Sequence, residues 1–136
     1  MSITLTCSTS MGAKRYYDCR GVPNFMRFSD KSLKKNTAQV DKALEKVSKL
    51  KGVSFNWKSA EEAGIENLPQ GKDIGVTAQD VEKVLPELVK DVPVKKTDGT
   101  TPTLKTINYA GLVGVLIEAV KELKKENQEL RQQVGL

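Results

Sequence analysis

The chain has no histidine and only two cysteines, and these absences exclude much familiar chemistry. A Ser-His-Asp triad needs a histidine as its general base. A structural zinc site needs four ligands, drawn mainly from cysteine and histidine. We therefore expect neither of these sites, and we predict no metal ion or other cofactor. Cys7 and Cys19 leave a disulfide open, but two free thiols in a cytosolic protein is the favoured interpretation.

Long apolar runs and aromatic residues are also scarce. No run approaches the roughly 20 apolar residues that a membrane-spanning helix needs, so we expect no membrane partner. Aromatic residues make up 5% of the chain and are not interleaved with arginines, as a platform for single-stranded nucleic acid requires. The net charge is +5, but Lys42, Lys46 and Lys49 alternate with Asp41 and Glu45. A solvated helix face explains these lysines, and we expect no nucleic-acid binding.

The 136 residues suffice for one domain with an appendage. Short strand patterns mixed with helical ones predict an α+β fold: a small body followed by a long C-terminal helix. We divide the chain into a short β-like segment at 1–28, a body at 29–112 and a helix at 113–136. Ser2 to Ser10 alternate between apolar and polar residues, which is typical of a half-buried strand. That segment is too short for a core of its own.

Within the body, a helix is expected from Asn36, which with Gln39 makes a capping box, to a stop at Gly52. Its apolar face consists of Val40, Ala43, Leu44, Val47 and Leu50.

Further along, strands are expected over 53–57 and 74–76, joined by an exposed insertion. A helix opens at Thr77 or Ala78 and breaks at Pro86, with an inward face made of Val81, Val84, Leu85, Leu88 and Val89. The Asp98-Gly99 pair then predicts a tight hairpin turn, and Asn108 is a plausible cap of the last helix.

The last helix carries an apolar seam with the 3-4 spacing of a left-handed coiled coil, at positions a and d of a heptad. Its members are Val113, Leu116, Val120, Leu123, Asn127, Leu130 and Val134. Asn127 is a lone polar residue at an a position, a device that sets register. Glu126 at g can face Arg131 at e of a neighbouring helix, and Lys124 occupies another e position.

Either the rest of the chain or other copies of it must cover this seam. Additional apolar residues upstream, among them Val115, Ile117 and Ala119, predict that Leu116, Val120 and Leu123 lie where the helix meets the body. β-Branched residues at a with leucine at d permit a dimer.

Four motifs in order carry a resemblance to a known family. They are Ser29-Asp30-Lys31-Ser32-Leu33-Lys34-Lys35-Asn36, the strand motif at 52–58, the segment at 74–89 from Ile74-Gly75-Val76 to Leu88-Val89, and Asn108-Tyr109 leading into 112–123. Together, over roughly residues 26–125, they resemble the intramolecular chaperone domain of phage tail spikes and tail fibres, the S74 peptidase family.

The resemblance implies a homotrimer that helps fibre chains to fold in register and then cuts itself free. Its partner is a phage tail fibre or another virion protein, and its location is the virion tail, or the host cytoplasm during assembly. The cut falls between Phe28 and Ser29, and Ser29 and Lys34 are the implied catalytic residues. The resemblance also makes the C-terminal helix a trimeric coiled coil.

The chemistry agrees with the residues available. A serine hydroxyl is a weak nucleophile until a base removes its proton. Without histidine, lysine is the natural base, provided that desolvation lowers its pKa. Ser29 follows the scissile bond, so its hydroxyl attacks the preceding carbonyl, and such a site acts once.

Three alternatives stay open. Ser29-Asp30 is also a common turn sequence, with Lys34 as a solvated residue. A structural trimeric adaptor or fibre cap that never cleaves is the second interpretation, with residues 1–28 docking onto another virion protein. An ordinary coiled-coil module is the third. Only 28 residues precede the site, where the family carries hundreds, so the purpose of cleavage is also open.

Overall fold

The structure, a computed structural model, describes residues 28–136. The chain divides into two compact units, residues 1–38 and 39–136. The strand expected from Ser2 to Ser10 and both cysteines lie outside the described residues. In the first unit, the described segment contains one short 3₁₀ helix, η1 (Lys31–Leu33).

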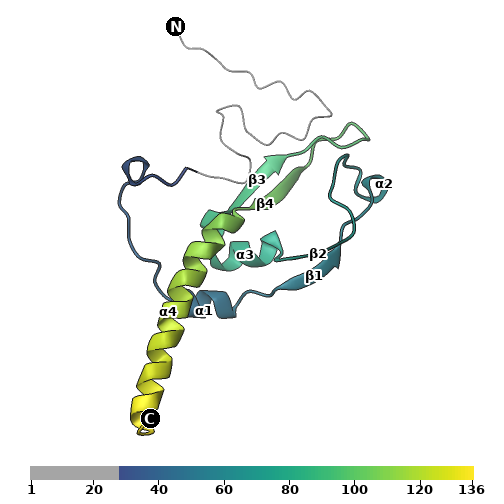
Figure 1. The fold of residues 1–136 in the computed structure, drawn as a ribbon. Coiled ribbons are helices and arrows are strands. Elements are labelled where there is room, and N and C mark those ends of the chain that lie inside the picture. Colours follow the sequence, from purple (N-terminus) through teal and green to yellow (C-terminus); the bar gives the residue numbers. More distant parts are fainter. Residues whose placement is uncertain (1–27) are drawn as a thin grey trace. The chain divides into compact units, whose positions relative to one another are not determined.

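The second unit mixes short strands with helices and ends in a long helix, so the predicted α+β class is confirmed (Figure 1). Its elements are α1 (Ala43–Ser48), β1 (Val53–Asn56), α2 (Ala60–Ala63), β2 (Lys72–Gly75), α3 (Ala78–Val84), η2 (Pro86–Leu88), β3 (Val89–Pro93), β4 (Thr103–Ile107) and α4 (Tyr109–Gln133). β1 pairs with β2 and β3 pairs with β4, giving two separate antiparallel sheets of two strands each.

The hairpins follow the turn signals of the sequence. β3 and β4 are joined through Gly99, whose φ of 87° is a conformation that glycine adopts without strain. The Asp98 carboxylate accepts a hydrogen bond from the N–H of Thr100 at 2.8 Å, which closes the predicted turn. The insertion between β1 and β2 contains one unpredicted element, α2, which Ser59 and Glu62 cap reciprocally.

Four helical elements, α1, α3, η2 and α4, contribute to a small apolar core. Val81 and Leu85 from the α3 region have exposed fractions of 0% and 1%, and Ala43 from α1 has 0%. Leu88, Val115 and Ala119 complete the core, the last two from α4. The inward face predicted for 81–89 is confirmed, as is the break at Pro86, where α3 gives way to η2.

Helix α1 is much shorter than expected. Asn36 does not cap a helix; its φ is 53°, in the left-handed region, and α1 begins at Ala43 and ends before Gly52, at Ser48. The predicted capping box and the glycine stop are therefore wrong. The cap comes instead from α4: the Glu122 carboxylate accepts hydrogen bonds from the N–H groups of Ala43 and Leu44 at 3.0 and 2.8 Å. A local sequence pattern cannot reveal an acceptor so distant in the chain.

Helix α4 begins where the sequence predicts. The Asn108 side chain accepts a hydrogen bond from the N–H of Gly111 at 3.1 Å. A side chain at Gly111 would collide with Leu88, so the glycine lets the first turn of α4 lie against η2. Among residues 28–136, no helix has the length and apolar character needed to span a membrane.

The body contacts a different face of α4 from the one predicted. Val115 and Ala119 are buried against the core, with Leu112 packed beside them, and Glu122 holds α1. Leu116, Val120 and Leu123 are 48%, 65% and 53% exposed. The expectation that these three lie between helix and body is wrong, because the buried positions are offset around the helix from the seam.

A groove of about 630 Å³ lies between the β1–β2 hairpin, the start of α3 and β4. Phe55 and Trp57 meet edge to face on one wall, with ring centroids 5.1 Å apart. Trp57 donates its indole N–H to the Asp73 carboxylate at 3.0 Å. The Tyr109 hydroxyl forms hydrogen bonds with the backbone of Val76. The first residue of α4 therefore contacts the chain directly after β2.

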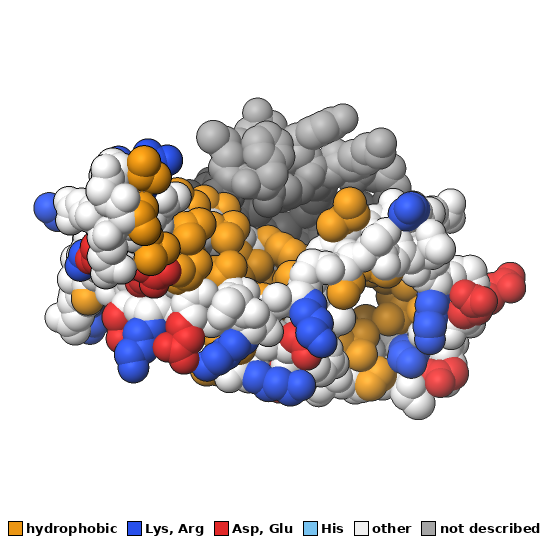
Figure 2. All heavy atoms as spheres, turned by 90° about the horizontal axis from the view of Figure 1, so that it is seen from below, with side chains coloured by type: hydrophobic (Ala, Val, Ile, Leu, Met, Phe, Trp, Pro, Cys, Tyr) orange, Lys and Arg blue, Asp and Glu red, His pale blue; other side chains and the backbone are white. Residues whose placement is uncertain are grey.

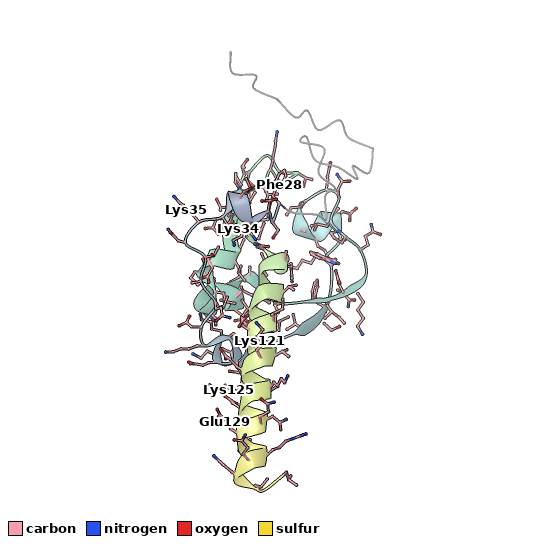
Figure 3. The ribbon with its side chains drawn as sticks, turned by 60° about the vertical axis from the view of Figure 1, so that its left-hand side comes forward. Phe28, Lys34, Lys35, Lys121, Lys125 and Glu129 are labelled. Atoms are coloured by element: carbon pink, nitrogen blue, oxygen red, sulfur yellow. The ribbon has the colours of Figure 1, made fainter. Side chains whose placement is uncertain are left out.

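We predict that Glu122→Ala destabilises the chain by roughly 1–3 kcal/mol, because two N–H groups of α1 lose a charged acceptor. Glu122→Gln keeps one acceptor oxygen and should fall between wild type and alanine. Urea unfolding at one protein concentration measures the difference. Glu129→Ala is the matched control, since Glu129 lies exposed farther along the same helix (Figure 3). Equal unfolding midpoints for Glu122→Ala and Glu129→Ala would contradict the cap.

The pKa of the Asp73 carboxyl is lowered from 3.8, first by the hydrogen bond from Trp57 and then by the N–H of Ile74. The ionised form is therefore favoured, and its bond to Trp57 should persist as the pH falls to 3.8 and break only below it. Trp57 is the single tryptophan, so its fluorescence reports this titration. Asp73→Asn should abolish the transition, and a wild-type midpoint above 3.8 would refute the assignment.

Candidate functional site

Ser29 and Lys34 lie in contact in the first unit. The Nζ of Lys34 donates a hydrogen bond to the Oγ of Ser29 at 2.7 Å. This is the distance across which a proton passes between a base and a nucleophile. The structure thus brings together the two residues that the sequence motif singles out.

A tight turn makes this contact. η1 occupies three of the four residues between Ser29 and Lys34. Asp30 is its N-cap, and one carboxylate oxygen accepts hydrogen bonds from the N–H of Ser32 at 2.8 Å and from the Ser32 hydroxyl at 2.6 Å. The role of this pair was not predicted, although an aspartate two residues before a serine is a recognisable turn signal.

Both members of the Ser29–Lys34 pair are exposed in the single chain, and Phe28 before them is 59% exposed. Lys34 and Lys35 project from the segment in different directions (Figure 3). Of these two lysines, Lys34 is the one that donates a hydrogen bond to the Ser29 hydroxyl. The geometry therefore distinguishes the two neighbouring lysines.

The arrangement suits attack on the peptide bond that precedes Ser29. The hydroxyl belongs to Ser29, the residue that supplies the nitrogen of that bond, so it needs no separate substrate to reach the Phe28 carbonyl. A neutral lysine amine can take the hydroxyl proton, and water must be excluded for lysine to be neutral. The single chain leaves the pair in solvent.

A second feature is the exposed seam of α4. The apolar seam residues are exposed by 56% at Val113, 48% at Leu116, 65% at Val120, 53% at Leu123, 61% at Leu130 and 68% at Val134. Asn127, Lys124, Glu126 and Arg131 are exposed as well. Figure 2, which looks along α4 from its C-terminal end, shows hydrophobic side chains gathered next to the helix. Within the second unit, nothing covers this face.

The apolar stripe is wider near the start of α4 than the seam alone. Ile117, at an e position, is 52% exposed. It continues the surface of Val113, Leu116 and Val120 around the helix. Ile117 was expected in the apolar stretch where the helix meets the body, and the structure places it on the exposed side.

In residues 28–136, no three acidic, cysteine or histidine side chains lie close enough together to hold a metal ion. Lys105 instead uses two carboxylates, Glu82 at 2.9 Å and Asp91 at 3.1 Å, to link α3 to the β3–β4 hairpin. These partners raise the pKa of Lys105, Glu82 first. The acidic groups here serve ion pairs on the surface.

Comparison with known families identifies the segment that carries the Ser29–Lys34 pair. Residues 29–90 match the S74 peptidase family, described as the chaperone of endosialidase. The match begins at Ser29 itself and extends through the core residues of α3.

Similar proteins are found among phage tail fibres. The long tail fiber protein Gp37 of Enterobacteria phage K3 is 34% identical over 108 residues, which are 79% of this chain and 8% of the relative. The Gp37 protein of Enterobacteria phage M1 is 34% identical over 105 residues, 76% of this chain and 38% of the relative. For Escherichia phage AR1 the values are 35% over 95 residues, 69% and 8%. The chain thus spans well under half the length of these relatives.

Proposed function

We propose, since this chain belongs to the chaperone-of-endosialidase family, that it is an assembly domain of a phage tail fibre. In this proposal it forms a homotrimer through α4, keeps fibre chains in register, and cuts once between Phe28 and Ser29. Its location in this proposal is the virion tail, or the host cytoplasm during assembly. The observation that carries the proposal is the 2.7 Å contact between Lys34 and Ser29.

The case for self-association rests on the two faces of α4. One face, through Val115 and Ala119, is already used by the body. The seam lies elsewhere on the helix and is exposed throughout. A stripe of this length and spacing is stabilised when helices from other copies bury it.

The width of the stripe favours three helices over two. A two-stranded coiled coil buries a narrow stripe of a and d positions, whereas a helix in a bundle also buries e or g. Ile117 supplies such an e position near the body. This contribution opposes the preference for dimers of β-branched a residues with leucine at d, and it agrees with the threefold symmetry that the family resemblance implies.

The proposed cut proceeds in two steps. Lys34 removes the proton of the Ser29 hydroxyl, and Oγ attacks the carbonyl carbon of Phe28. The Phe28–Ser29 C–N bond breaks, the nitrogen takes up the proton, and the Phe28 acyl group is left as an ester on Oγ. Water then hydrolyses this ester, giving a Phe28 carboxylate and a free Ser29 hydroxyl.

Trimer formation is the proposed trigger. In the single chain the pair is exposed, and contact with water favours the charged form of an amine. Neighbouring copies that exclude water from Lys34 would favour its neutral form. Cleavage should therefore follow assembly and should be slow in the monomer.

We predict that Leu123→Ala shifts the protein from trimer toward monomer. Each chain loses a side chain that the trimer would bury, which costs roughly 2–5 kcal/mol of stability per site. Light scattering over a range of concentrations measures the mass. Lys125→Ala, an exposed change on the same helix at a position outside the seam, should leave the trimer intact (Figure 3).

The same pair of changes separates assembly from folding. Since Leu123 is not in the core of the second unit, the Leu123→Ala monomer should keep its helical circular dichroism. Val115→Ala removes a core side chain and should lower the stability of the unit itself. A wild-type mass of one or two chains at micromolar concentration would reject the trimer.

We predict that wild-type protein breaks between Phe28 and Ser29 after the trimer forms. Ser29→Ala removes the nucleophile and should abolish the cut. Lys34→Arg should also abolish it, because a guanidinium group stays protonated. Lys35→Ala is the control and should cut normally. Intact-mass spectrometry over time distinguishes the whole chain from the product that begins at Ser29.

Two results would change this assignment. Cleavage that persists in Ser29→Ala would refute the mechanism. A wild-type trimer that stays whole would favour the alternative function, a structural adaptor or cap of a tail fibre that never cleaves.

A further inference from the structure

We propose that Asp30 is a positioning residue for the Ser29–Lys34 pair, acting through the turn that its carboxylate holds. The proposal rests on the self-cleavage proposed above and assigns a role to a side chain that neither chemical step uses. Asp30 touches no reacting atom: the hydrogen bonds that its carboxylate accepts both come from Ser32.

The pair requires a turn. Residues five positions apart in an extended chain are separated by about 17 Å. The observed distance between Lys34 Nζ and Ser29 Oγ is 2.7 Å. A lysine side chain cannot cover that difference alone, so the backbone between the two residues must fold back.

The turn is held by hydrogen bonds rather than by packing. The backbone N–H of Leu33 bonds to the carbonyl of Asp30, and that of Lys34 to the carbonyl of Lys31, both at 3.1 Å. None of the three residues of η1 is buried. One 3₁₀ turn without burial is marginal, since its few hydrogen bonds must offset the entropy of ordering it. A side-chain cap therefore contributes much of its stability.

Asp30 supplies that cap. Its carboxylate oxygen takes both the N–H and the hydroxyl of Ser32, the second residue of η1. These two bonds lower the pKa of Asp30, the hydroxyl contributing most, so the cap is present at neutral pH. A cap of this kind needs an acceptor oxygen at this place, which asparagine also provides.

The role of asparagine separates positioning from charge. If Asp30 works through the turn, Asp30→Asn should cut at close to the wild-type rate, whereas Asp30→Ala should cut roughly two- to thirtyfold more slowly, the range for loss of an N-cap. The rate constant is measured on the full chain by intact-mass spectrometry. Asp41→Ala, an exposed aspartate in the second unit, is the matched control and should cut normally. Light scattering checks that every variant has the wild-type mass.

A second measurement does not depend on cleavage. Ser29→Cys places a thiol where the hydroxyl lies, and a nearby lysine ammonium raises the reactive thiolate fraction. Its alkylation by iodoacetamide, followed by peptide mapping to separate it from Cys7 and Cys19, reports the proximity of Lys34. Adding Lys34→Ala should slow alkylation. Adding Asp30→Ala should slow it toward the same level, while Asp30→Asn should not.

The outcomes are distinct. Asp30→Ala that leaves both cleavage and alkylation unchanged overturns the proposal. If Asp30→Asn behaves like Asp30→Ala, the proposal is also overturned, because charge rather than the cap is then required. An alkylation rate that Lys34→Ala leaves unchanged overturns it as well. If no chain cleaves but alkylation follows the expected order, the positioning role of Asp30 is supported while the proposed self-cleavage fails.

Discussion

The burial of Val115 and Ala119 of α4 in the core that α1, α3 and η2 share is the contact on which the second unit depends. The sheets have only two strands each and supply little core of their own. By using one side of α4 for the body, this packing determines which side remains exposed. The seam is therefore available for self-association without any rearrangement of the unit, and the bonds from Glu122 attach α1 to the same helix.

Sequence patterns predicted most of the elements because their signals are local. Gly99 with Asp98 marked the β3–β4 turn, Pro86 marked the end of α3, and Asn108 marked the start of α4. The failures share one physical cause. The true start of α1 depends on a carboxylate far along the chain, and the face of α4 that meets the body depends on how α1 and α3 pack. Periodicity cannot reveal a distant acceptor. It also cannot select the buried face of α4, because the first turns of that helix are apolar on both sides.

The candidate site divides in the same way. Ser29 and Lys34 were predicted from the motif that resembles the family, and the structure adds the contact between them. Their catalytic role, the seam and the division of the chain into three segments stay predictions. The bonds between Asp30 and Ser32 were missed because a turn at Ser29-Asp30 was considered only as an alternative to catalysis, and not as a support for it. The exposure of Ile117 was missed because composition alone cannot tell which apolar face is covered.

The cap that Glu122 places on α1 has a consequence for the order of events during synthesis. A helix of six residues is too short to persist by itself in water. Its acceptor arrives only when the ribosome has added almost eighty further residues. Until then the first turn of α1 lacks the acceptor for its N–H groups. The segment from Ala43 to Ser48 therefore gains its helical cap only after the first half of α4 has been synthesised.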